Sequence, residues 1–251
     1  MTNRQTIEFL GIQVDVLDTQ GLCEQIVDFS LKGKQCKVFY VNADCILLSL
    51  KDKIYRQMLN RADLLYADGI GVIWGAKLWG HYLPSRSTAA DFIPKFCEVF
   101  ARYGLKIYFL GASDGVAKEA ANRLLQKIPN LQIVGTHHGY FKGEETKRII
   151  EAINTVRPHI LLVGLGAPYQ EQWIEENANG LDVPVIWGVG GLFDFISGRT
   201  WRGPQWLLDH GFEWFCRLIA EPRRLWRRYL IGNTKFVIYL LWYRFISHKT
   251  W

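Results

Sequence analysis

The chain of 251 residues carries a formal net charge of +6 and is 49% hydrophobic. This length fits one large domain, or one domain with a substantial appendage, and the apolar content excludes a chain that is disordered throughout. The five cysteines are odd in number and lack metal-ligand spacing. No hydrophobic leader segment precedes them, so we expect buried, reduced thiols in a cytoplasmic protein and no structural zinc.

The positive charge is concentrated at one end of the chain. Residues 195–251 contain ten Arg and Lys against three Asp and Glu, a local charge of +7, and six of the ten tryptophans. The first 194 residues are therefore close to neutral. A basic, aromatic-rich tail fits an anionic membrane surface or nucleic acid, and a basic helical subdomain with a solvated face is the plainer alternative.

The first 194 residues alternate between apolar strands and helices. Strands are predicted over residues 37–41, 64–67, 107–110, 131–134, 160–163 and 183–187, and helices over 44–60, 69–79, 92–103, 116–127, 144–156 and 170–177. Continuously apolar strands separated by helices indicate a parallel sheet that is covered on both faces. We therefore predict a Rossmann-like, doubly wound α/β domain over 1–194 and a helical appendage over 195–251.

Ligands of such sheets bind at the carboxyl ends of the strands. Here those ends are polar or small, at Asn42, Asp68, Gly111, Gly164 and Gly188. Turns between strands and helices favour Gly, Asn and Asp for conformational reasons alone. The combination of five such ends nevertheless favours a nucleotide or sugar site.

Asp68 is the first candidate for chemistry, because it follows an apolar strand and precedes Gly69. A carboxylate in this place can take a proton from an acceptor hydroxyl, or it can cap the next helix. Asn42 has the same two alternatives, a ligand contact or a cap. Arg86 lies in a nearby loop, where its guanidinium suits a diphosphate unless it is an ordinary surface arginine.

Two glycine-bearing turns, at residues 111–115 and 164–166, could hold phosphate through backbone N–H groups. Neither matches the dinucleotide-binding fingerprint or a P-loop, so each is a weak signal alone. Gln170, after the second turn, points toward the same cleft in this interpretation. His137 and His138 are expected to point to opposite faces of a strand and to form no metal site.

Five arginines fall within twelve residues of the tail, at 217, 223, 224, 227 and 228, and tryptophans are interleaved with them. Phosphates of a lipid or of a pyrophosphate substrate are natural partners for these cations, and interfacial aromatic residues favour a membrane over solvent. The longest uninterrupted apolar run, residues 236–243, is eight residues. A spanning helix needs about 20, so this run is expected to lie in an interface without crossing the bilayer.

These residues resemble the WecG/TagA/CpsF family, glycosyltransferase family 26. The blocks that carry the resemblance are VNADCILLSL, YADGIGVIWGAKLWG, FLGASDGVAKEAA, LLVGLGAPYQEQWI and GVGGLFDFISGRTWRGPQW continuing to EWFCRLIAEPRRLWRRY. They keep their order and spacing between about residues 37 and 230.

The resemblance implies inverting transfer of a sugar from a UDP-sugar to a polyprenyl-diphosphate-linked saccharide, at the cytoplasmic face of the membrane. It matches Asp68 to the family's proposed base, with Asn42 and Arg86 beside it. It also matches Gln170, Arg217, Arg224 and Arg227 to substrate-binding residues. We further expect Tyr40, Gly111, Gly164 and Asp194 to contact substrate.

The chain departs from the family pattern at Tyr40, where many members have Thr, and at Ala89, where Gly is common. These departures leave the donor sugar open between a mannosamine derivative, glucose and another hexose. Two other functions stay open: a UDP-sugar-binding, membrane-docked regulator without catalysis, and a dinucleotide-dependent oxidoreductase. We expect no cofactor, no bound metal and no nucleic acid partner, and the oligomeric state is left open, with a homo-oligomer compatible with the sequence.

Overall fold

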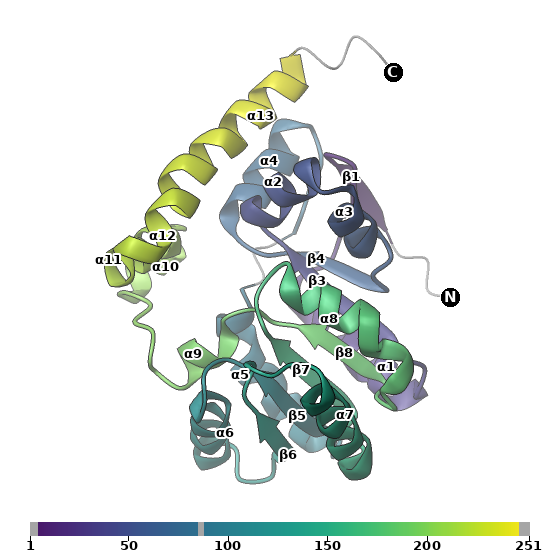
Figure 1. Ribbon diagram of the computed structural model, residues 1–251. Coiled ribbons are helices and arrows are strands. Elements are labelled where there is room, and N and C mark those ends of the chain that lie inside the picture. Colours follow the sequence, from purple (N-terminus) through teal and green to yellow (C-terminus); the bar gives the residue numbers. More distant parts are fainter. Residues whose placement is uncertain (1–4, 85–87, 246–251) are drawn as a thin grey trace.

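The computed structural model describes residues 5–84 and 88–245. A six-stranded parallel sheet in the order β4-β3-β8-β7-β5-β6 forms its centre (Figure 1). The strands are β3 (Cys36–Val41), β4 (Leu64–Ala67), β5 (Lys106–Gly111), β6 (Gln132–His137), β7 (Ile160–Gly164) and β8 (Val185–Gly188). Strands β3, β4, β5, β7 and β8 are almost wholly buried, which agrees with their continuously apolar sequences.

Helices cover both faces of the sheet, as the alternating pattern predicts. One face carries α1 (Thr19–Lys32), α5 (Ala89–Arg102), α6 (Val116–Lys127) and α9 (Leu192–Ile196). The other carries α2 (Ala43–Lys51), α3 (Lys53–Asn60), α7 (Glu144–Val156) and α8 (Tyr169–Asn177), which the short helix η1 (Ala178–Gly180) follows. This division follows from right-handed crossovers, which place a helix on one face or the other according to the direction in which the chain moves across the sheet. The α/β fold class is thereby confirmed.

Three features differ from the predicted elements. An antiparallel hairpin of β1 (Thr6–Phe9) and β2 (Ile12–Asp15) precedes α1 and was not predicted. The helix expected over 44–60 is two helices, because Asp52 ends α2 and its side chain accepts from the backbone N–H groups of Ile54 and Tyr55 to begin α3. The strand expected over 131–134 extends to His137.

The core beside α5 is aromatic. The ring of Trp187 on β8 stacks on Phe92 at a centroid distance of 5.9 Å and meets Tyr66 edge-on at 6.1 Å. Trp187 and Tyr66 are nearly inaccessible to solvent. Large buried rings contribute strongly to stability, so this cluster holds α5 rigidly under the carboxyl ends of β3, β4 and β8.

The C-terminal region is helical, as predicted. It consists of α10 (Gln205–Asp209), α11 (Glu213–Ala220), α12 (Pro222–Trp226), a π-helical segment η2 (Arg227–Gly232) and α13 (Asn233–Phe245). Helix α13 lies beside α2 and also packs on α4 (Ile70–Leu78), at the β4 end of the sheet (Figure 1). We call residues 201–245 the appendage.

Candidate active site

The carboxyl ends of β3 and β4 bring Asn42 and Asp68 together. These strands pair in parallel up to Val41 and Ala67, and the N–H of Asp68 donates to the carbonyl oxygen of Val41 at 2.8 Å. Asn42 and Asp68 are the next residues on each strand. Both line a cavity of about 500 Å³ between the sheet edge and the appendage.

Asp68 stands at the start of α4 without holding its N-cap position. That position belongs to Gly69, whose φ of 91° is a conformation that favours glycine and which has no side chain to cap with. Burial, and secondarily the charge of Asp68, raises the pKa of the Tyr66 hydroxyl well above its ordinary value. The half-buried carboxylate at the cavity wall is a candidate general base.

Asn42 performs the capping role that its position also suggested. Its Oδ1 accepts from the backbone N–H groups of Asp44 and Cys45, both at 3.0 Å, and so begins α2. The Nδ2 group of the same side chain takes no part in that cap. Because Asn42 also lines the cavity, capping fixes the orientation of its amide toward any ligand there.

The appendage supplies two cations to the cavity wall, Arg217 from α11 and Arg228 from η2. The Nε of Arg228 lies 3.1 Å from Oδ2 of Asp44. The Arg217 guanidinium stacks over the ring of Phe195 at 4.8 Å and reaches Gly191, where an added Cβ would lie 3.5 Å from its Nη2. Each arginine therefore joins the appendage to a loop at a strand end.

Arg202 fixes α11 to the α/β domain. Its Nη1 lies 2.8 Å from Oδ1 of Asp91 on α5, and its Nη2 lies 3.3 Å from Oε2 of Glu213 on α11. Arg202 is largely buried and also lies over the Phe195 ring. The pair of contacts sets the position of α11, and with it the position of Arg217.

The other predicted arginines lie elsewhere. Arg224 is exposed and forms a double contact with Glu221, with Nη2 to Oε1 at 2.9 Å and Nε to Oε2 at 2.6 Å. Arg227 is exposed and stacks over Trp226 at 5.2 Å. Neither lines the cavity, and their expected substrate contacts stay predictions. Arg86 falls outside the described residues.

The two glycine turns of β5 and β7 pack directly against each other. A Cβ on Gly111 would lie 2.4 Å from the carbonyl oxygen of Gly164, and the N–H of Ala112 donates to that same oxygen at 3.0 Å. Gly164 in turn has no room for a side chain beside Gly190 and Phe193. Glycine is required at both positions because two backbones meet there.

Gln170 lies under these turns and is fully buried. Its Oε1 accepts from the N–H of Gly190 at 2.8 Å, and its Nε2 donates to Oε1 of Glu171 at 2.7 Å. Tyr40 is also buried, and its hydroxyl packs against Gly190. A Cβ added to Gly190 would lie only 2.5 Å from the hydroxyl oxygen. Gln170 and Tyr40 thus shape the Gly190 loop from below, a structural role that the sequence did not predict.

Two carboxyls near these loops have raised pKa values. Burial raises the pKa of Glu171 to about 7, against its hydrogen bond with Gln170, and Oε2 of Glu171 has no hydrogen-bond partner in the described part of the chain. Burial also raises the pKa of Asp194, while Arg224, Arg199 and Arg217 oppose the rise.

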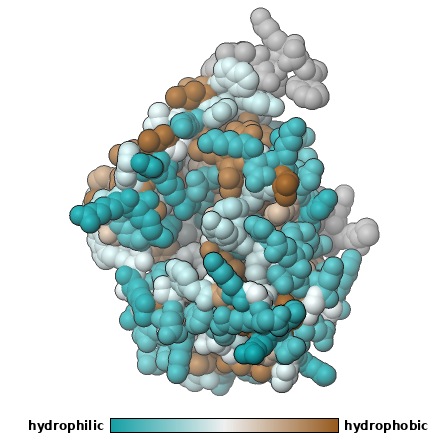
Figure 2. Space-filling model, in the orientation of Figure 1, coloured by the Kyte–Doolittle hydropathy of each residue, from teal (hydrophilic) through white to brown (hydrophobic). Residues whose placement is uncertain are grey.

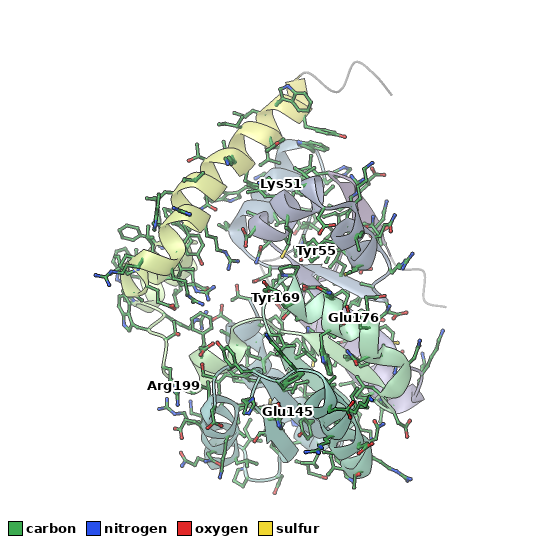
Figure 3. All side chains as sticks on the ribbon, viewed as in Figure 1. Lys51, Tyr55, Glu145, Tyr169, Glu176 and Arg199 are labelled. Atoms are coloured by element: carbon green, nitrogen blue, oxygen red, sulfur yellow. The ribbon has the colours of Figure 1, made fainter. Side chains whose placement is uncertain are left out.

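Arg199 lies in the linker after α9 (Figure 3). Its Nη2 would lie 3.9 Å from a Cβ added to Gly115, in the turn before α6.

His137 and His138 do not diverge, and that expectation was wrong. Their ring centroids are 4.4 Å apart, because β6 ends at His137 and strand alternation does not extend to the next residue. Together with Glu145 on α7 (Figure 3), they place three ligand atoms within 4.8 Å of one another, close enough to hold a metal ion. This cluster belongs to the β6 edge, opposite the β4 edge that carries Asp68.

The sequence did not single out several residues that line the cavity. Arg228, Glu213, Trp214 and Tyr229 all do so from the appendage. The sequence shows Arg228 only as one of the five clustered arginines of the tail. Spacing on an ideal helix could not select among the arginines, since η2 is π-helical and shifts the residues after it.

Apolar side chains are exposed along the appendage. Trp206, Ile219 and Ile238 have 63%, 56% and 59% of their surface accessible, and Trp226 and Trp242 are also exposed. Figure 2 shows brown side chains along the appendage, at the upper left of the view, beside teal ones. Over residues 5–84 and 88–245, none of the helices combines the length and apolarity that a membrane span requires.

The model of the glycosyl transferase WecG/TagA/CpsF family matches residues 7–250. A protein of Bacillus subtilis (strain 168), named N-acetylglucosaminyldiphosphoundecaprenol N-acetyl-beta-D-mannosaminyltransferase, is 31% identical over 190 residues, which is 76% of this chain and 73% of that protein. Proteins with the same name from Bacillus spizizenii (strain ATCC 23059 / NRRL B-14472 / W23) and Staphylococcus aureus (strain NCTC 8325 / PS 47) are 30% and 26% identical. They align with 87% and 90% of this chain and over 83% and 89% of their own lengths.

Proposed function

The chain belongs to the glycosyl transferase WecG/TagA/CpsF family, and from that premise we propose that it moves a sugar from a UDP-sugar to a saccharide carried on a polyprenyl diphosphate. One cavity carries this proposal. It is lined by a strand-end carboxylate, Asp68, and by two cations of the appendage, Arg217 and Arg228. A base and diphosphate-binding groups are the two needs of such a transfer.

In this mechanism Asp68 takes the proton of the acceptor hydroxyl as its oxygen attacks the anomeric carbon of the donor sugar. The bond from that carbon to the UDP oxygen breaks, UDP leaves with the electron pair, and the configuration inverts in a single displacement. Asn42, held by its cap, orients a sugar hydroxyl. A positioned carboxylate base typically contributes about 10²–10⁴-fold to the rate.

The UDP portion is proposed to lie over the turns of β5 and β7, beside Asp194. Gly111 and Gly164 carry no side chains there, and helices α6 and α8 begin just after these turns. Gln170 and Tyr40 hold the Gly190 loop in place beneath the nucleotide. Helix N-termini and Arg86 would balance the charge of the UDP diphosphate, while Arg217 and Arg228 in the cavity would balance that of the acceptor diphosphate.

The appendage is proposed to dock peripherally on the cytoplasmic face of the membrane that carries the acceptor. Its exposed apolar side chains alternate with exposed cations, including Arg223, Arg224 and Arg227. Each basic residue near an anionic membrane contributes about 1 kcal/mol, and interfacial tryptophans add to the attachment. The proposed acceptor is lipid-linked, so docking brings the cavity to its substrate.

The names of the relatives make N-acetylmannosamine the first donor sugar to test and a GlcNAc-diphosphate lipid the first acceptor. The experiment is a screen of UDP-sugars against GlcNAc linked through diphosphate to a short lipid, with the product identified by mass and by the configuration of the new bond. Transfer from one UDP-sugar supports the enzyme. Binding of a UDP-sugar without transfer to any acceptor would support the regulator instead.

A further inference from the structure

Part of the cavity that contains Asp68 is not used by the transfer reaction. Its walls are α4 and α13, and its lining is almost entirely apolar: Ile70, Trp74 and Leu78 from α4, and Phe236, Val237 and Leu240 from α13. On α4 the three residues are four apart, and so they form one stripe along the helix. We call this apolar part of the cavity, between α4 and α13, the trough.

Glycines set the spacing of the trough. A Cβ on Gly75 would lie 2.7 Å from Phe9 and 3.1 Å from Leu240, and one on Gly71 would lie 3.5 Å from Phe236. A methyl group at Gly75 would press on Phe9 and on Leu240 of α13, whereas one at Gly71 would make ordinary contact with Phe236. Gly71 and Gly75 thus allow α13 to pack directly on α4 through Phe236 and Leu240, which closes the base of the trough.

The trough begins at the cations. Arg228 lies at the start of η2, and Phe236, Val237 and Leu240 follow on the successive turns of α13. From Asn233 at its start to Leu240, α13 rises by about 10 Å, and the π-helical turn that begins near Arg228 adds to this length. A diphosphate held by Arg217 and Arg228 would leave its lipid at the mouth of this trough.

The apolar wall is partly open to solvent. Trp74 and Val237 line the cavity with 62% and 51% of their surface accessible, and beyond them Ile238, Leu241 and Trp242 continue the apolar surface outward along α13. Exposed apolar surface of this extent marks a ligand groove or a membrane contact. Here the groove leads from the charged end of the cavity to the exposed face of α13.

We propose that the trough between α4 and α13 holds the isoprene units next to the diphosphate of the acceptor lipid, so that the enzyme binds the lipid chain as well as its head. This inference rests on the proposed function for the identity of the acceptor. In this arrangement the polar end of the cavity holds the diphosphate. The trough holds the first isoprene units, and the exposed face of α13 meets the bilayer.

The test is an acceptor series with one saccharide diphosphate and one, two, three or more isoprene units, assayed without detergent and below the concentration at which the lipids aggregate. For the wild-type protein, KM falls by at least about tenfold for each unit that enters the trough and then levels off. Val237→Trp fills the trough and removes this length dependence. Leu78→Glu, on the opposite wall, has the same effect. Ile238→Trp, on the same helix but outside the cavity lining, keeps the length dependence. Unchanged length dependence in both trough variants would overturn the proposal.

A binding measurement separates failure of this proposal from failure of the proposed function. Farnesyl diphosphate and inorganic diphosphate are titrated into the full-length protein by calorimetry, with no sugar donor present. Farnesyl diphosphate should bind at least about tenfold more tightly, and Val237→Trp should abolish the difference. Equal binding of the two ligands to the wild-type protein contradicts the trough even if transfer activity is found. A farnesyl preference that Val237→Trp abolishes supports it even if no donor is turned over.

Discussion

The Nε of Arg228 in the appendage lies 3.1 Å from Oδ2 of Asp44, two residues after the strand-end Asn42. Burial opposes the charge of Arg228, but Asp44 and neighbouring groups outweigh it, so the pKa of this guanidinium lies above its ordinary value. The appendage is therefore joined by charge to the first turn of α2. The cavity at Asp68 is lined by both parts.

We expect Arg217→Ala and Arg228→Ala each to lower kcat/KM by roughly 10²-fold with a water-soluble acceptor diphosphate, because a charge-assisted contact to the substrate is lost. Arg223→Ala is the matched control, since Arg223 is exposed in the same segment and outside the cavity lining. Full activity of both cavity variants on the soluble acceptor would show that the appendage only anchors the protein.

Arg224→Ala and Arg227→Ala test the role that the family resemblance implies for these exposed arginines. We expect reduced transfer to the soluble acceptor, which requires that Arg224 leave Glu221 when substrate binds. Initial rates with the soluble acceptor and with liposome-embedded acceptor distinguish contact with the substrate from contact with the membrane surface. A loss confined to liposomes would place both arginines at lipid headgroups.

Glu171→Gln should change how stability depends on pH. The pKa of this carboxyl rises from an ordinary 4.5 to about 7 in the folded protein, so the native state holds the proton more tightly than the unfolded state. Stability from this group is complete below about pH 4.5 and is lost as pH rises through about 7, a loss of about 3 kcal/mol for a shift of this size. Urea denaturation at pH 5 and pH 8 should show a smaller difference for the variant than for the wild type. If the free energy of unfolding changes equally between the two pH values in both proteins, the pKa of Glu171 is not raised by folding.

Ile238→Ser with Trp242→Ser should weaken binding to anionic liposomes, because both side chains are exposed on α13. Raising the ionic strength should weaken binding further by screening the basic residues. Co-sedimentation measures this, and turnover of the soluble acceptor by the same variant is the control. Unchanged sedimentation would place the membrane contact on another surface.

UDP should bind more tightly than ADP or NAD, and chelation with EDTA should leave its affinity unchanged. The proposed diphosphate contacts are backbone N–H groups and arginines. Titration calorimetry with and without EDTA checks this. A double variant, His137→Ala with His138→Ala, shows whether any EDTA effect comes from the histidine and Glu145 cluster at the other sheet edge. Loss of UDP binding in EDTA, in the wild type and in this variant alike, would require a metal at the nucleotide.

The sheet and the pairing of Asn42 with Asp68 could be predicted, because buried parallel strands have continuously apolar sequences and end at one edge. The break at Asp52 could have been recognised, since Asp52 is a favourable N-cap inside an apparently continuous helix. The hairpin at β1 and β2 has only four residues in each strand, and its turn places Leu10 at a φ of 54°. Strands so short carry little periodic signal.

The position of Arg228 could not be predicted, for a different reason. Which arginine of the appendage faces the cavity depends on the packing of α13 against α4 through Gly71 and Gly75, and on the π-helical segment between α12 and α13. Both are tertiary features. The buried contacts of Gln170 likewise depend on Gly190, twenty residues further along the chain.

The most direct test of the central claim is the transfer rate of Asp68→Asn, measured with the UDP-sugar and lipid diphosphate acceptor that the screen identifies. The amide is nearly isosteric with the carboxylate but cannot take the acceptor proton. We predict that kcat falls by at least about 10²-fold while Tm and UDP affinity stay at wild-type values. Asp182→Asn, exposed near the opposite end of β8, is the control and should keep full activity. A well-folded Asp68→Asn protein with wild-type kcat would contradict the assignment of this cavity as the site of transfer.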